Sequence, residues 1–486
     1  MGVLDGLGTD KVFYYFEEIT KIPHGSGNED ALADYIVNFA KERGLYCRKD
    51  EAGNVVVKKP AAKGYENVKP VILQGHIDMV CEKLADIEHD FTKDPLELVI
   101  DGDFICAKGT TLGADNGIAA AYMLAVLDKA DMLHPAMEMV FTVEEETGMD
   151  GAKKLDTSDL EGKYFINMDS EEEGKFLISC CGGRRVHVLL PVERIAKKAD
   201  GLTYLLKIRG LKGGHSGSDI HLQRASANKL IGRVLYELEK SIPFALVSVD
   251  GGKMDNAICR EADAVLTITK EDAEKAEKIV KAMEKMLQEE YHHTETDMMI
   301  TWEKLHEETT KVLTEDWKKR VIAMLLLIPY GVEAMSLDIV GLVESSSNIG
   351  VVSTKQDGIH FDNAIRSAVA SKKEMICEKI AALAEICGGK TMENNDYPGW
   401  VYDVNSKLMK VLQQSYRQAT GKEPELTAIH AGVECGLFAE KMEGLDMVSL
   451  GPDMYDVHTP KERLSISSTI RMWDFLKEAL REMENI

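Results

Sequence analysis

The chain begins with two segments in which apolar residues recur at spacings of three and four. The first runs from Lys11 to about Ile22, and the second follows Asn28 and ends near Gly44. This spacing places the apolar side chains along one face of a helix, and Asn28 is a residue type that caps helix N-termini. The pattern therefore predicts two amphipathic helices before the first strand.

Short apolar runs rich in β-branched residues follow, and an alanine-rich stretch separates two of them. Runs of four to eight such residues are typical of buried strands. Their alternation with helices predicts an α/β fold in which a sheet is covered on both faces, with binding sites at the strand ends. We expect strands at Val55–Lys58, Val71–Gln74, Glu138–Val143 and Tyr164–Asn167, and a helix from about Gly117 to Lys129.

The middle of the chain has a different pattern, with β-type runs and long charged helices after Gly183. The earlier pattern returns from Pro398, and 486 residues exceed what one hydrophobic core usually serves. We expect a discontinuous domain of residues 1–186 and 397–486, interrupted by an α+β domain of residues 187–396. The expected helices are Leu222–Lys240, Glu271–Tyr291, Ala370–Cys387, Asn405–Thr420 and one from about Ser468, with strands around Leu426 and Met447.

The composition argues against several kinds of partner. The 58 basic and 82 acidic residues give a net charge of −24, which repels a nucleic-acid backbone. The longest strongly apolar run, Val321 to Pro329, is shorter than the roughly 20 residues that a membrane helix requires. The N-terminus has no export signal, and the nine scattered cysteines are typical of reduced core thiols. We expect a cytoplasmic protein without a nucleic-acid or membrane partner.

Acidic residues and histidines cluster at the ends of the predicted strands. Each cluster alone has an ordinary interpretation as a turn, a solvated face or a surface hydrogen bond. However, apolar strands run directly into the Glu144–Glu146 triplet and into Asp169. Carboxylates at buried strand ends need cations, and zinc accepts both imidazole and carboxylate ligands. The five segments are Gln74–Asp78, Gly113–Gly117, Glu145–Gly148, Asn167–Ser170 and Asp456–Pro460.

Seven segments occur in an order that is known from one family, over nearly the whole chain. They are QGHIDMV, GTTLGADNGI, TVEEETGMDGA, NMDSEEEG, GLKGGHSG, IHAGVECGLF and GPDMYDVHTPKE. The sequence resembles the two-zinc metallopeptidase superfamily of carboxypeptidase G2, aminoacylase and acetylornithine deacetylase, and most closely its aminoacyl-histidine dipeptidase branch. This resemblance implies a zinc-peptidase-like catalytic domain with a mixed sheet, and a lid domain formed by residues 187–396.

The resemblance also implies two zinc ions per chain, for which cobalt or manganese can substitute. Asp115 would bridge both ions, and a cis peptide would join it to Asn116. Glu145 would be the catalytic base, because the family pattern Glu-Glu-x-Gly fits only at Glu145–Gly148. Asp78 would orient the first histidine ligand. The implied metal ligands are His76, Asp115, Glu146, Asp169 and His458.

The lid domain carries further residues that match the family. His215 lies in a glycine-flanked segment that resembles the family's substrate-binding loop. Asn256 matches a lid position that contacts substrate, and Arg260 is a candidate for holding a terminal carboxylate. His430 and Glu434 lie either near the metals or in structural positions, and the sequence leaves both interpretations open.

These features predict hydrolysis of small peptides by a water that the two ions share and Glu145 activates. The resemblance favours dipeptides of the Xaa-His type, including carnosine-like compounds, and a homodimer. A deacylase or carboxypeptidase on the same scaffold remains an alternative, because metal ligands do not distinguish amide substrates. A noncatalytic metal-dependent binding protein is a further alternative, against which an intact Glu145 argues.

Overall fold

The computed structural model describes residues 2–8, 10–197, 201–306 and 310–486, and the chain divides into two compact units. The first comprises Met1–Ser179, Val401–Ala428 and Val433–Ile486, and the second comprises Cys180–Trp400 and Ile429–Gly432. Residues 180–186, 397–400 and 429–432 were expected in the first domain. They belong to the second unit because they continue its strands or bond to them.

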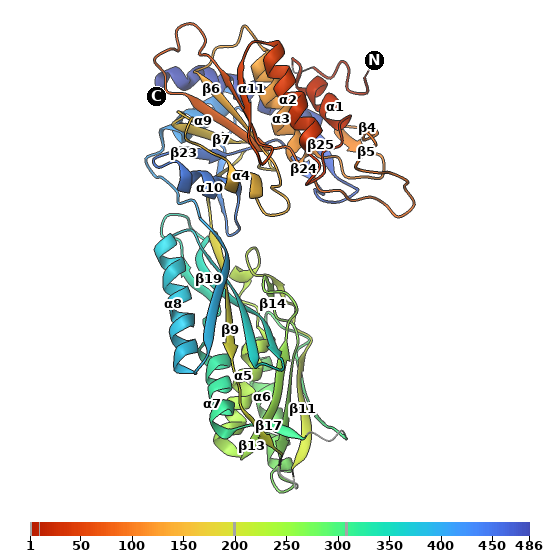
Figure 1. The fold of residues 1–486 in the computed structure, drawn as a ribbon, viewed down its shortest axis with the longest axis vertical. Helices are drawn as coiled ribbons and strands as arrows, with labels where there is room; N and C mark the ends of the chain where they lie inside the picture. Colours follow the sequence, from red (N-terminus) through yellow and green to blue (C-terminus); the bar gives the residue numbers. More distant parts are fainter. Residues whose placement is uncertain (1, 9, 198–200, 307–309) are drawn as a thin grey trace. The chain divides into compact units, whose positions relative to one another are not determined.

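Three neighbouring strands lie parallel at the centre of the first unit, and β23 (Asp446–Ser449) continues the parallel run beside the last of them (Figure 1). The three are β3 (Val71–His76), β6 (Met137–Thr142) and β7 (Tyr164–Asn167). Every residue of β3 and β6 is buried, as expected for strands covered on both faces. The sheet has the order β1-β2-β6-β3-β7-β23-β8-β22 and is mixed, because β2 is antiparallel to β6. The outer strands are β1 (Tyr46–Lys49), β2 (Val55–Lys59), β8 (Lys175–Cys180), β22 (Glu425–Ile429) and β23 (Asp446–Ser449).

Helix α3 (Ala114–Asp128) packs closely against β3. A Cβ atom added at Gly75 would lie 2.6 Å from the Cβ of Ala119, so only glycine allows this approach. The contact places the first turn of α3 beside the end of β3. The other helices of this unit are α1 (Val12–Thr20), α2 (Asp30–Glu42), α4 (Asp150–Lys154), α9 (Lys407–Thr420), α10 (Glu434–Lys441), α11 (Ile466–Glu482) and the short η2 (Met483–Asn485).

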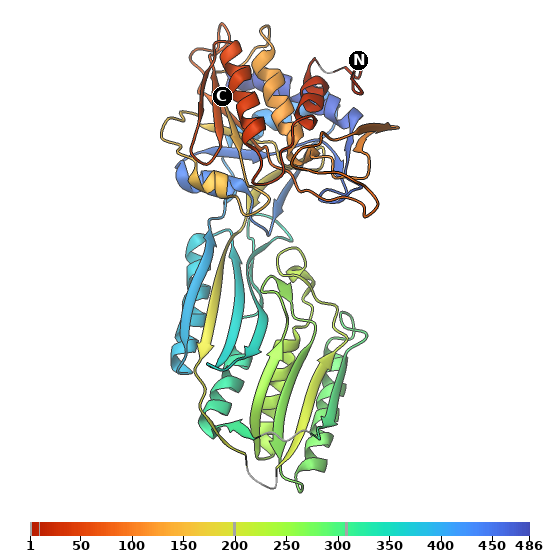
Figure 2. The same cartoon turned by 45° about the vertical axis from the view of Figure 1, so that its right-hand side comes forward.

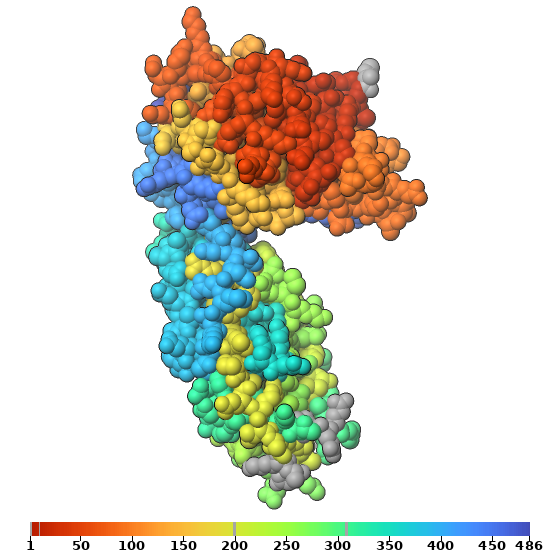
Figure 3. All heavy atoms as spheres, in the orientation of Figure 1, coloured from red at the N-terminus to blue at the C-terminus, as the bar shows by residue number. Residues whose placement is uncertain are grey.

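A small four-stranded sheet joins two distant parts of the sequence in the first unit. Its order is β24-β25-β5-β4, and the loop between β24 (Met454–Tyr455) and β25 (Arg463–Ser465) carries His458. The other two strands are β4 (Leu98–Asp101) and β5 (Phe104–Ala107). Figure 3 shows the segment around them, in orange, at the edge of this unit.

The second unit is a nine-stranded sheet with helices packed on one face (Figure 2). Buried and partly exposed residues alternate along β11 and β15, which is the pattern of strands covered on one side. Its strands are β9 (Gly182–Leu190), β11 (Leu202–Arg209), β13 (Phe244–Gly251), β15 (Ala262–Ile268), β16 (Met299–Lys304), β18 (Gly331–Met335), β19 (Val343–Thr354), β20 (Ile359–Ser367) and β21 (Lys390–Tyr397). Its helices are α5 (Ala227–Ser241), α6 (Ala273–Glu290), α7 (Glu315–Leu327) and α8 (Ala370–Ile386).

Two further strand pairs and a short helix complete the second unit. The pairs are β10 (Arg194–Ala196) with β17 (Lys311–Leu313) and β12 (Gly214–His215) with β14 (Ala257–Ile258). The short helix η1 spans Ile220–Leu222. It lies where the sequence predicted the start of a long helix, and α5 begins only at Ala227.

The structure confirms the predicted fold class, α/β with an α+β insertion. The predicted strands agree with the observed ones to within two residues. Asn28 was wrong as a cap, because α2 begins at Asp30 and its N-cap residue is Glu29. Six of the nine cysteines are buried as expected, but Cys47 and Cys106 are partly exposed and Cys81 is exposed. Among the described residues, no helix has both the length and the apolar character needed to span a bilayer.

Candidate metal centre

The carboxyl ends of β3, β6 and β7 bring the predicted ligand segments together in the first unit. His76 is the last residue of β3, the Glu144–Glu146 turn follows β6, and Asp169 follows β7. Because these strands are parallel, their carboxyl ends lie at the same edge of the sheet. The start of α3 supplies Asp115, and the β24–β25 loop supplies His458.

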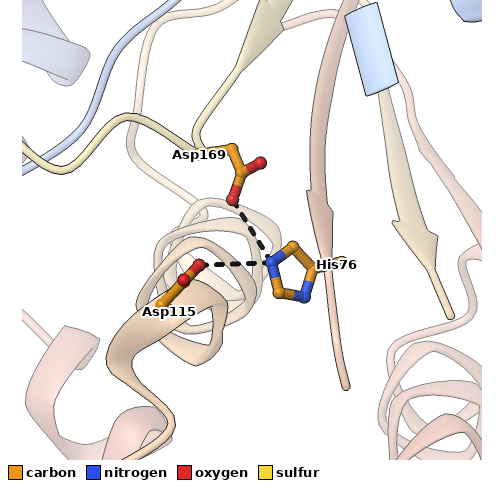
Figure 4. Close-up of side chains that lie close together, drawn as sticks. All are labelled: His76, Asp115 and Asp169. Carbon is orange, nitrogen blue, oxygen red and sulfur yellow. Dashed lines mark hydrogen bonds and ion pairs between the residues drawn. The ribbon is translucent and has the colours of Figure 1, made fainter. Parts of the chain in front are cut away.

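His76 faces two carboxylates (Figure 4). Its Nε2 atom lies 3.2 Å from Oδ1 of Asp115 and 3.3 Å from Oδ1 of Asp169. The Asn116 side chain donates to the same Asp169 oxygen at 2.7 Å, which fixes its orientation. The peptide between Asp115 and Asn116 is cis, as the resemblance implied.

His458 faces a second pair of carboxylates. Its Nε2 atom lies 3.0 Å from Oδ2 of Asp115 and 2.9 Å from Oε1 of Glu146. Asp115 therefore directs one oxygen toward His76 and the other toward His458. A single carboxylate placed in this way can serve two ions at once.

The residues present fit two divalent cations. Tetrahedral ligand atoms at 2.0–2.1 Å from zinc lie about 3.3 Å from one another. The nitrogen-to-oxygen distances above, 2.9 to 3.3 Å, agree with that spacing. The groups His76, Asp115, Asp169 and Asp115, Glu146, His458 each bring their ligand atoms within 4.8 Å of one another.

The charges of the cluster also favour cations. Burial raises the pKa of Glu145 to about 9; the charge of His76 opposes this shift, and the charges of Asp169, Glu434 and Glu146 contribute to it. Burial likewise raises the pKa of Asp169. Hydrogen bonds to Asp115 and Glu146 raise the pKa of His458 to about 10. A cation among these groups favours the charged carboxylates and so offsets the cost of burying them.

Asp78 forms polar contacts with residues of both ligand groups. Its backbone oxygen lies 3.0 Å, and its Oδ1 atom 3.3 Å, from Nδ1 of His76. Its carboxylate also accepts hydrogen bonds from the backbone N–H groups of Glu145 and Glu146, at 3.0 and 3.2 Å, and from the Ser26 hydroxyl at 2.8 Å. The sequence suggested only the contact with His76. Asp78 therefore also positions the turn that carries the expected base.

Two further glutamates lie near the cluster. Glu434 is fully buried and accepts hydrogen bonds from Gln74 and Thr142, at 2.5 and 2.8 Å. Burial raises its pKa to about 7, as it does that of Glu171 beside Asp115. Glu434 thus lies close to the residues expected to bind metal, which is one of the two positions that the sequence left open. Glu171 was not predicted from the sequence, although it lies in the NMDSEEEG segment.

His215 belongs to the second unit, where its ring is held in one tautomer. The backbone N–H groups of Gly217 and Ser218 donate to Nδ1, at 3.3 and 3.2 Å. Nδ1 therefore accepts, and the ring proton resides on Nε2. Burial and the charge of Arg366 lower the pKa of His215, which keeps the ring neutral. The exposed side chain consequently presents a hydrogen-bond donor.

Arg366, which the sequence analysis missed, is a buried cation in the same unit. It is 5% exposed, its Nη1 donates to the Tyr397 hydroxyl at 3.2 Å, and its guanidinium also interacts with the Cys181 thiol. Among the described residues no ion pair includes Arg366, and its Nε atom has no hydrogen-bond partner. His430 lies nearby, and its Nε2 bonds to Ser346 at 2.7 Å. A buried guanidinium without a carboxylate partner can bind an anionic group.

The other two predicted substrate residues lie close to the His215 loop. The backbone oxygen of Asn256 accepts a hydrogen bond from the Ser216 N–H at 2.8 Å. Arg260 is exposed, and its Nε donates to the Leu211 oxygen at 3.2 Å. The structure therefore brings both to the same region of the second unit as His215.

The chain matches the model of peptidase family M20/M25/M40 over residues 72–482. It is 38% identical over 483 residues to the cytosol non-specific dipeptidase of Escherichia coli (strain K12), which covers 99% of each chain. The solved structure of the aminoacylhistidine dipeptidase from Vibrio alginolyticus is 39% identical and has a TM-score of 0.95, covering 98% of this chain and 97% of that one.

A more distant structure shares the fold alone. It is the aminopeptidase PepT from Bacillus cereus, which is 15% identical with a TM-score of 0.56 and covers 99% of this chain and 100% of its own. The family match and the full-length relative confirm the resemblance found in the sequence. The chain therefore belongs to peptidase family M20/M25/M40 and is a metal-dependent hydrolase.

Proposed function

We propose that this protein hydrolyses dipeptides at a centre of two divalent ions, with zinc as the resident metal. The observation that supports this most strongly is the Asp115 carboxylate, which faces His76 with one oxygen and His458 with the other. Asp115 would bridge the two ions. Asp169 would complete the site of His76, and Glu146 would complete the site of His458.

Glu145 is the proposed catalytic base. Two cations held by these ligands would supply Lewis acidity to the scissile carbonyl and the attacking water. Glu145 accepts the proton of that water and passes it to the leaving amine. A ligand atom of Glu145 also comes within 4.8 Å of His76 and Glu146. The two groups proposed above each have three ligands without Glu145, which leaves its carboxylate available as a base. Asp78 orients His76 and fixes the backbone of Glu145.

The second unit supplies the proposed substrate contacts. His215 donates a hydrogen bond from Nε2 to the carbonyl oxygen, where negative charge develops. Asn256 and Arg260 are proposed as further contacts, as the sequence suggested. We assign the terminal carboxylate to Arg366 in preference to Arg260, because Arg366 is buried without an ion-pair partner and Arg260 is exposed.

The substrate class follows from the relatives. One is named as a non-specific dipeptidase and another as an aminoacylhistidine dipeptidase. We propose that dipeptides with C-terminal histidine, including carnosine-like compounds, are the preferred substrates within a broader dipeptide range. The Escherichia coli relative and the net charge of −24 support a cytosolic enzyme without a nucleic-acid partner. A homodimer remains part of the proposal on the strength of the resemblance.

A metal-free preparation tests the activity and the metal together. We expect activity to be lost on chelation and restored by zinc, manganese or cobalt, with two ions bound per chain. The assay should compare Xaa-His dipeptides with other dipeptides, N-acetyl amino acids and longer peptides. Preferential hydrolysis of acetylated amino acids would favour a deacylase, and binding of two ions without hydrolysis would favour a noncatalytic protein.

Substitutions in the glutamate turn separate its roles. Glu145→Gln should retain both ions and lower kcat by about 100- to 10,000-fold, because glutamine cannot accept the proton. Glu146→Gln should weaken one metal site and recover activity partly with excess metal. Glu144→Gln is the control, and it should change little. If Glu144→Gln is inactive while Glu145→Gln remains active, the base is Glu144 and the assignment of Glu145 is wrong.

Two arginine variants locate the carboxylate contact. Arg366→Met should raise KM for a dipeptide by about 100-fold, because a buried charge pair with substrate is lost. It should change KM much less for the dipeptide amide, which lacks the carboxylate. Arg260→Met is the comparison variant, and it should raise KM for the dipeptide much less than Arg366→Met does. The reverse pattern in the two variants would return the carboxylate to Arg260.

A further inference from the structure

The segment that leads into α3 presents backbone N–H groups without a local acceptor. The first N–H groups of a helix have no partner within the helix and are usually satisfied by a nearby Ser, Thr, Asp or Asn. Here the N-cap residue is Gly113, in the left-handed region at φ 68°, and it has no side chain to offer. This segment carries Asp115, so its position decides where the bridging carboxylate lies.

Glu462 supplies the missing acceptors from a distant part of the sequence. Its Oε2 accepts from the N–H groups of Leu112 and Gly113, at 2.6 and 3.0 Å. Its Oε1 accepts from Ala114 and Asp115, at 2.8 and 3.2 Å. The side chain is only 3% exposed, so water does not replace it. One carboxylate thus binds four consecutive N–H groups, which an amide with a single acceptor oxygen cannot do.

The same residue ends the loop that carries His458. The N–H of Glu462 donates to the Thr459 oxygen at 3.0 Å, and the Thr459 hydroxyl donates to the Asp456 oxygen at 2.7 Å. Asp456 and His458 both have left-handed backbones, at φ 54° and 62°, which non-glycine residues rarely adopt. Glu462 therefore joins the loop of His458 to the segment of Asp115.

We propose that Glu462 is a positioning residue of the metal centre. It binds neither ion nor substrate, but it sets the separation of Asp115 and His458. It thereby sets the affinity for the ion that these two ligands hold together with Glu146. This inference rests on the two-ion centre proposed above, and it goes beyond it by assigning a role to a side chain outside the ligand set.

The test compares two buried glutamates that both accept backbone N–H groups. Glu462→Gln keeps the shape of the side chain but turns an NH₂ group toward two of the donors. The control is Glu138→Gln, because Glu138 is 3% exposed and accepts from Glu161 and Gly162 but does not contact the ligands. Metal-free proteins are titrated with Zn²⁺ against a competing chelator, and their urea unfolding is measured without metal.

We expect Glu462→Gln to lower the affinity for one of the two ions by about 10- to 100-fold, as the loss of a group that orients a metal ligand does. Activity should recover as Zn²⁺ is raised. Glu138→Gln should lower stability alone. If Glu462→Gln fails to fold, Glu462→Asp replaces it. Aspartate keeps both carboxylate oxygens on a shorter side chain, and this variant should also lower the affinity for one ion.

Two other outcomes would overturn the inference, and they are distinguishable. Unchanged affinity for both ions in the folded Glu462 variant, with stability alone reduced, would make Glu462 a helix cap and nothing more. Failure of the unsubstituted protein to bind two ions would instead remove the proposed metal centre, and the role of Glu462 with it.

Discussion

Mutual repulsion of carboxylates is the constraint on which the first unit depends. Asp115, Glu145, Glu146 and Asp169 meet at the ends of the central strands. They form three groups of possible ligands with His76 and His458, and within each group the ligand atoms lie within 4.8 Å of one another. At that distance two charges repel by about 3.5 kcal/mol for an effective dielectric constant of about 20. Several such pairs approach the 5–15 kcal/mol that stabilises a whole domain. The cluster is therefore consistent with a fold that holds cations.

Two further carboxylates support the cluster by accepting backbone hydrogen bonds instead of binding metal. Asp78 accepts the N–H groups of Glu145 and Glu146, and Glu462 accepts four N–H groups at the start of α3. These bonds fix the main chain on either side of the ligands. Because backbone dipoles stabilise the two supporting carboxylates, the cations can be shared among the ligands alone. The positions of both ligand groups thus depend on main-chain hydrogen bonds.

The features that could be predicted are those visible in short stretches of sequence. Features that depend on contacts between distant parts of the chain could not be predicted. The strand ends at His76 and Asp169 could be predicted, because a run of apolar residues followed by a ligand type is visible within a few residues. The start of α3 could not, since its acceptor Glu462 lies 347 residues from Asp115 in the sequence. Arg366 carries no local motif. Its lack of an ion-pair partner becomes visible only when the second unit is folded.

Anomalous diffraction from crystals grown with zinc tests the two-ion centre most directly. Data collected on both sides of the zinc absorption edge should show two peaks per chain. One should lie between His76 and Asp169 and the other between His458 and Glu146, with an oxygen of Asp115 on each. A single peak, or two peaks that do not share Asp115, would contradict the bridging role on which the proposed function rests.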